Sequence, residues 1–91
     1  MIRTVKLLIS GRVQGVFFRK FTKQKANELD IFGTVRNLDD GSVEVIAQAE
    51  ADKLEAFIQW CRKGPITARV DKVDMVGPAY TDDIFNSFEI V

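Results

Sequence analysis

The sequence predicts an α+β fold in which two helices pack on one face of a four- to five-stranded antiparallel sheet. Short segments with alternating apolar side chains predict strands, and two longer segments with apolar side chains at steps of three and four predict helices. Their order is strand, helix, strand, strand, helix, strand, with one more short strand at the end. This order is typical of the ferredoxin-like split βαβ sandwich. The 91 residues have room for one domain, so we expect residues 1–91 to form a single unit.

The first half of the chain contains a strand, a helix and a second strand. Residues 4–10 alternate apolar and polar side chains, broken only at Leu8, which predicts a strand. Residues 18–29 place lysines between regularly spaced apolar side chains, which predicts an amphipathic helix. Residues 33–38 favour a strand, and residues 39–41 (DDG) tolerate the left-handed backbone of a tight turn. The second strand should therefore fold back at once.

The second half begins with the clearest alternation in the chain, at residues 42–49. One face of this predicted strand carries Val43, Val45, Ala47 and Ala49. Residues 52–63 repeat apolar side chains at helical spacing, and the glycine and proline at residues 64–65 form a combined stop signal. The second helix is therefore expected to end there.

Two further strands complete the predicted sheet. Residues 70–76 are β-prone and are followed by a glycine and a proline at residues 77–78. Residues 85–91 follow a polar turn at residues 81–83 and supply a short final strand.

The composition excludes several classes of function. Thirteen basic residues balance thirteen acidic ones, so no strong field attracts nucleic acid or anionic lipid, and we expect neither as a partner. Histidine is absent, which removes Ser-His and Cys-His nucleophile pairs and histidine-rich metal sites. Cys61 is the single cysteine, which excludes an internal disulfide and suits a reducing compartment. Its place on the apolar stripe of a helix favours a packing role.

The sequence also predicts where the protein works. Its first residues are too polar for a secretory signal, and nothing approaches the ~18 apolar residues of a membrane span. We therefore expect a cytoplasmic protein that binds no membrane.

The loop after the first strand is the strongest candidate for a binding site. It contains Gly11 and Gly15 and leads into the start of a helix. Such a loop leaves backbone N–H groups without partners at the positive end of the helix dipole, which suits phosphate or another small anion, although many glycine loops are only turns. Arg19 would add a permanently charged, forked donor.

The predicted topology brings Asn37 to the same edge of the sheet as this loop. Asn37 has the same parity as the core-facing Val35, so it should lie on the helix-covered side near the start of the first helix. Its position alone leaves two interpretations open. The amide could satisfy the turn that follows, or it could orient a water molecule, because positioning does most of the work in phosphoryl transfer.

Two long segments resemble the signature segments of the acylphosphatases. These are residues 11–19 (GRVQGVFFR) and residues 33–44 (GTVRNLDDGSVE). Residues 64–65, 68–70 (ARV) and 88–90 (FEI) are similar to later parts of that family, so the resemblance covers essentially the whole chain. It implies a single acylphosphatase-like domain.

The resemblance implies metal-independent hydrolysis of the carboxyl–phosphate bond of small acyl phosphates, without a cofactor and in a monomer. By this resemblance, Arg19 and backbone amides of the loop would bind phosphate, and Asn37 would orient the attacking water. The phosphate-binding loop would consist of Gln14, Gly15, Val16, Phe17, Phe18 and Arg19. The missing histidine fits this chemistry, because an acyl phosphate is an activated anhydride whose carboxylate leaves readily. The substrate phosphate itself could take the proton of the water.

Three positions depart from the family pattern. Thr34 stands where many relatives have an aromatic residue, Asp30 where glycine is frequent, and Leu38 where some members have a hydroxyl. None removes an implied catalytic group. The alternative function is a non-catalytic small-anion-binding or regulatory module with the ferredoxin-like fold. RNA binding is disfavoured because Val43 and Val45 offer no aromatic stacking platform on the third strand.

Overall fold

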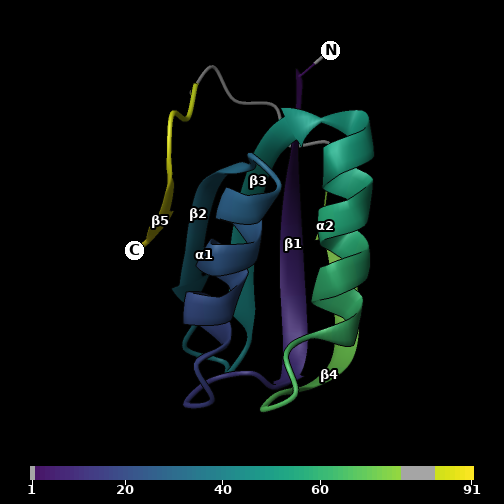
Figure 1. The fold of residues 1–91 in the computed structure, drawn as a ribbon. Helices are drawn as coiled ribbons and strands as arrows, with labels where there is room; N and C mark the ends of the chain where they lie inside the picture. Colours follow the sequence, from purple (N-terminus) through teal and green to yellow (C-terminus); the bar gives the residue numbers. More distant parts are fainter. Residues whose placement is uncertain (1, 77–83) are drawn as a thin grey trace.

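Two helices cover one face of a five-stranded sheet (Figure 1). The computed structural model describes residues 2–76 and 84–91. The strands are β1 (Ile2–Arg12), β2 (Phe32–Asn37), β3 (Val43–Glu50), β4 (Arg69–Val76) and β5 (Phe88–Ile90), and the helices are α1 (Phe18–Glu28) and α2 (Ala51–Lys63). Every predicted element is present, and the predicted fold class is confirmed. The predicted signals at residues 77–78 and 81–83 lie outside the described residues.

The strands follow the order β4-β1-β3-β2-β5. β1 pairs antiparallel with both β3 and β4, and β2 pairs antiparallel with β3. β5 pairs parallel with β2. The sheet is therefore mixed, whereas the sequence predicted a wholly antiparallel one. Alternating side chains have the same period in both directions, so the pattern of the last strand could not reveal its direction.

The core lies between the helices and the sheet. The four apolar residues predicted to share a face of β3 are all buried, and Val45 pairs with the buried Leu7 of β1. α2 contributes Leu54, Phe57 and Cys61 to this core. Burial raises the pKa of the Cys61 thiol to about 12. The thiol is therefore protonated near neutral pH and packs as a small apolar group, as predicted.

The turn from α1 to β2 contains two unusual backbone conformations. Asp30 has a φ of 56°, a left-handed conformation that glycine adopts more easily. This explains physically why the departure at Asp30 is tolerated, since aspartate visits this region more readily than most residues. Gly33 is different, because a Cβ there would lie 1.8 Å from the carbonyl oxygen of Ile46. Only glycine fits where β2 approaches β3 at this point.

A buried carboxylate links neighbouring strands on the face of the sheet that the helices do not cover. Glu44 is buried, and its carboxylate lies 2.9 Å from the Arg36 Nε and 3.3 Å from the Lys6 Nζ. Burial alone would raise the pKa of Glu44, but the hydrogen bonds and charges of Arg36 and Lys6 outweigh that effect and lower it. Three neighbouring strands are thus joined through one charged side chain.

This carboxylate makes the stability depend on acid. The pKa of Glu44 in the folded state lies below its ordinary value of 4.5. The ionised carboxylate therefore stabilises the fold at pH values above 4.5, and this stability is lost as the pH falls through the lowered pKa. We expect Glu44→Gln to lower the free energy of unfolding by about 1 kcal/mol near neutral pH. The variant should also lose less stability than the parent on acidification, as measured by urea unfolding at several pH values. Glu55→Gln, on an exposed position of α2, is the matched control. An unchanged acid dependence in Glu44→Gln would contradict this assignment.

Candidate active site

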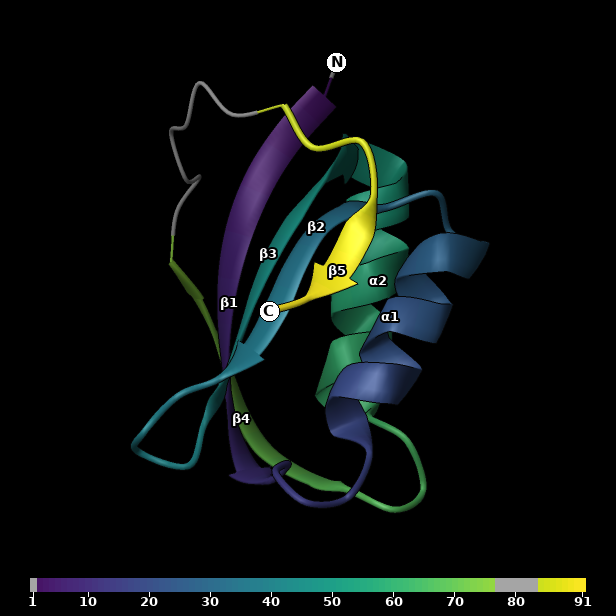
Figure 2. The ribbon, with the colours of Figure 1, turned by 90° about the vertical axis from the view of Figure 1, so that its left-hand side faces the viewer.

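Three loops gather at the edge of the fold opposite the N-terminus (Figures 1 and 2). They are residues 13–17, called here the β1–α1 loop, residues 38–42, called the β2–β3 turn, and residues 64–68 between α2 and β4. The register explains the grouping, because Ile9 of β1 and Asn37 of β2 both pair with Val43 of β3. The prediction that the β1–α1 loop and the end of β2 share an edge is confirmed.

The β1–α1 loop has a backbone shape suited to an anion. Gly15 and Phe17 both have left-handed conformations, with φ of 74° and 62°, and Val16 between them does not. Such alternation turns successive N–H groups toward one concave side. No side chain caps α1, and its first turn contains no acidic residue. The first N–H groups of the helix are therefore available to a ligand at the positive end of the helix dipole.

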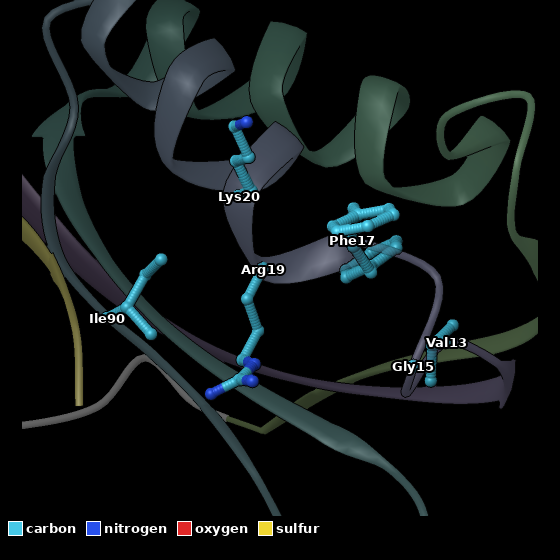
Figure 3. A pocket seen from close by; sticks show the side chains of 7 residues that line it. Val13, Gly15, Phe17, Arg19, Lys20 and Ile90 are labelled. Carbon is cyan, nitrogen blue, oxygen red and sulfur yellow. The ribbon is translucent and has the colours of Figure 1, made fainter.

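A cavity of about 280 Å³ opens against the first turn of α1 (Figure 3). Its lining residues are Val13, Gly15, Phe17, Phe18, Arg19, Lys20 and Ile90. Most of the predicted phosphate-binding loop therefore faces one cavity. Ile90 comes from β5 at the far end of the chain and was not predicted as part of the site.

Arg19 lines this cavity and has no carboxylate partner among the residues that the structure describes, and the same holds for Lys20. Figure 3 shows Arg19 and Lys20 leaving the first turn of α1 in opposite directions, with Arg19 directed toward the sheet. Within residues 2–76 and 84–91, no carboxylate or carbonyl accepts a hydrogen bond from the half-buried Arg19 side chain. Lys23 on the same helix is instead paired with Glu89 at 3.1 Å. The guanidinium therefore remains free to bind an anion.

Two side chains hold the β1–α1 loop to its neighbours. The Gln14 Nε2 donates to the carbonyl oxygens of Leu38 and Ser42, each at 2.8 Å. The Thr67 Oγ1 donates to the carbonyl oxygen of Val16 at 2.8 Å, which fixes the peptide whose N–H belongs to Phe17. Neither contact could be predicted from the sequence, because hydrogen bonds between residues this far apart leave no local pattern.

Asn37 ends β2 on the same side of the sheet as the core. It lies directly opposite the buried Val43, and opposite residues of an antiparallel pair point to the same face. The predicted helix-covered side is therefore confirmed. Asn37 itself is exposed and is not among the residues that line the cavity at Arg19, so the structure places it at the same edge without bringing it into that cavity.

The β2–β3 turn does not use the Asn37 side chain. The Ser42 N–H donates to the Asp40 Oδ1 at 2.9 Å, and the Leu38 N–H donates to the Ser42 carbonyl oxygen at 2.9 Å. The side-chain amide of Asn37 makes no hydrogen bond within the described part of the chain. This favours the interpretation that the amide serves a ligand over the interpretation that it satisfies the turn.

Residues 2–76 and 84–91 contain neither a cluster of metal-ligating side chains nor a membrane-spanning helix. No group of three or more cysteine, aspartate or glutamate side chains in these ranges could hold a metal ion. None of the helices described there has the length and apolar character needed to cross a membrane.

Comparison with known proteins identifies the family. A family model described as acylphosphatase matches residues 5–90. An acylphosphatase of Methylococcus capsulatus is 42% identical over 90 residues, which cover 99% of this chain and 97% of that protein. The structure of an acylphosphatase from Coxiella burnetii, 33% identical, superposes with a TM-score of 0.90 over 99% of this chain and 93% of the other. The structure of an acylphosphatase from Bacillus subtilis, 29% identical, superposes with a TM-score of 0.89 over 100% of this chain and 99% of the other. With the family model, the sequence and the fold in agreement, the chain belongs to the acylphosphatase family.

Proposed function

We propose that this acylphosphatase hydrolyses the carboxyl–phosphate bond of small acyl phosphates to a carboxylate and inorganic phosphate. The observation that carries the proposal is Arg19, which lines the cavity at the start of α1 and has no hydrogen-bond partner within residues 2–76 and 84–91, beside a helix start that no side chain in those ranges caps. A positive site with this geometry suits a phosphoryl group. The acyl part of the substrate would extend toward solvent past the exposed Phe17.

In this proposal the phosphoryl oxygens bind to the backbone N–H groups of residues 14–19 and to the Arg19 guanidinium. Arginine suits this role because its planar fork can donate two parallel hydrogen bonds to one phosphoryl group. These donors also stabilise the negative charge on the equatorial oxygens in the transition state. Thr67 supports the binding by holding the Val16 carbonyl.

The attacking water would be held by the Asn37 side chain. As the water oxygen bonds to phosphorus, the bond from phosphorus to the carboxyl oxygen breaks, and the carboxylate leaves with the electron pair. The proton of the water passes to an oxygen of the phosphoryl group. No protein base is needed in this scheme, which agrees with a chain that contains no histidine. No metal or cofactor takes part.

Every residue in this scheme comes from one chain, so we further propose that the enzyme acts as a monomer. We place it in the cytoplasm, since its single cysteine is a reduced, buried core residue.

A direct assay tests the function. Purified protein in excess chelator is given benzoyl phosphate, and release of benzoate and phosphate is followed. We expect turnover that neither the chelator nor added magnesium changes by more than about twofold, because the charge stabilisation comes from Arg19 and the loop amides. A folded protein that binds inorganic phosphate without turnover would contradict the proposal and support the non-catalytic anion-binding module. Activity that the chelator abolishes would contradict the metal-independent mechanism.

A further inference from the structure

We propose that Gln14 is a positioning residue for hydrolysis, whose side chain fixes Asn37 relative to the phosphate-binding loop. This inference rests on the proposed function. It gives a role to the Gln14 side chain, whereas the family resemblance implied only that the Gln14 backbone amide binds phosphate. Gln14 itself need not touch the substrate through its side chain. It would favour the attack of water on phosphorus by holding the end of β2 in place.

Two hydrogen bonds hold the amide nitrogen of the Gln14 side chain. Its amide nitrogen donates to the Leu38 and Ser42 carbonyl oxygens, both at 2.8 Å. An amide NH₂ carries two hydrogens, and here both are used. Because both partners can only accept, the nitrogen and not the oxygen of the amide must face the turn. The half-buried side chain is therefore held in one orientation.

These two bonds join the segment that binds phosphate to the segment that carries Asn37. Gln14 is part of the β1–α1 loop, and Leu38 follows Asn37 directly in the chain. The Leu38 N–H donates to the Ser42 carbonyl oxygen at 2.9 Å, so both carbonyls that Gln14 holds belong to one closed turn. Fixing this turn fixes the last residue of β2.

Asn37 needs such support because little else holds it. Its backbone pairs with Val43, but its side chain is exposed and makes no hydrogen bond within residues 2–76 and 84–91. The distance between Asn37 and Arg19 therefore depends on how the β2–β3 turn sits against the β1–α1 loop. An error of about 1 Å in the position of a reacting group can cost about 10²-fold in rate.

Phosphate binding should depend much less on this link. Arg19 is carried by α1, and the peptide between Val16 and Phe17 is held by Thr67 from another loop. Neither contact passes through the Gln14 side chain. Its loss should therefore weaken catalysis and leave the phosphate-binding groups in place.

The first test replaces Gln14 with Met, which keeps the length of the side chain and removes both donors. We expect kcat for benzoyl phosphate to fall about 10- to 100-fold, while the inhibition constant of inorganic phosphate changes by less than about threefold. Gln59→Met, the same change at an exposed position of α2, is the matched control and should match the parent in both measurements. If phosphate affinity falls as much as kcat, Gln14 supports binding and the inference is wrong.

The second test asks whether Gln14 acts through Asn37. In a double-mutant cycle, Gln14→Met should lower kcat by less than about threefold when Asn37 is already alanine, because residues that act through one another are not additive. If the kcat losses of the two single variants multiply in the double variant, the residues act independently and the inference is wrong. If Gln14→Met does not fold by circular dichroism, Gln14→Asn replaces it, since this shorter amide cannot reach both carbonyls.

The outcomes separate this inference from the proposed function. A parent without turnover, or an Asn37→Ala variant with full activity, would contradict the proposed mechanism and with it the role of Gln14. Full activity in Gln14→Met, together with an Asn37→Ala variant that is nearly inactive, would contradict the positioning role alone.

Discussion

The Arg19→Ala variant is expected to lose at least about 10³-fold in kcat/KM for benzoyl phosphate, since a positioned arginine contributes about 10³ to 10⁵ in phosphoryl transfer. Removing the guanidinium takes away one of the two positively charged side chains that line the cavity at the start of α1. Binding of inorganic phosphate, followed as competitive inhibition, should weaken in the same variant. The unfolding curve in urea should stay close to that of the parent, because Arg19 has no protein partner among the described residues.

Two further variants define what Arg19 supplies. Arg19→Lys keeps the positive charge but loses the planar fork, so it should recover only a small part of the activity. Arg62→Ala removes an exposed cation of α2 and should leave the activity unchanged. An Arg19→Ala variant that keeps phosphate affinity would show that the loop amides bind the anion without help from this side chain.

The Asn37→Ala variant is expected to lower kcat about 10²- to 10³-fold, the size typical for the loss of one oriented polar group in an active site. Its KM and its inhibition by phosphate should change by less than about threefold, because Asn37 holds water in the proposed mechanism and does not hold the phosphoryl group. Stability should be little affected, since the β2–β3 turn is closed by Asp40 and Ser42 and does not use the Asn37 amide. Steady-state kinetics and urea unfolding check both expectations.

Asn27→Ala, at an exposed position of α1, is the control for this amide. It should have the kinetics of the parent. If Asn37→Ala keeps full kcat, another group positions the water. If the variant instead loses phosphate affinity in proportion to its rate, Asn37 binds the phosphoryl group directly.

Most of the fold could be predicted because the sequence is locally consistent. The alternation from residue 42 to residue 49 and the stop signal at residues 64–65 each agree with the elements found. The direction of β5 could not be predicted, since a strand of three residues looks the same whether its neighbour runs parallel or antiparallel. The left-handed backbone of Phe17 was equally hidden, because only glycine and asparagine commonly signal that conformation.

The site could be predicted in part. Topology alone placed Arg19 and Asn37 at one edge, because strand directions decide which ends meet. The contacts made by Gln14 and Thr67 could not be predicted, since each joins residues that are distant in the sequence. The place of Ile90 in the cavity was hidden for the same reason.

The contribution of β5 to this cavity also bears on the order in which the molecule assembles. Residues 13–20 lie near one end of the chain and Ile90 near the other, yet they line one space. β5 is an edge strand of three residues, held by Gly33, Thr34 and Val35 of β2, and the Val91 N–H donates to the Val35 carbonyl oxygen at 3.0 Å. Closing so long a stretch of chain is slow, and a short edge strand is among the first elements to open. The part of the cavity wall that Ile90 supplies is therefore expected to form late in folding and to open early.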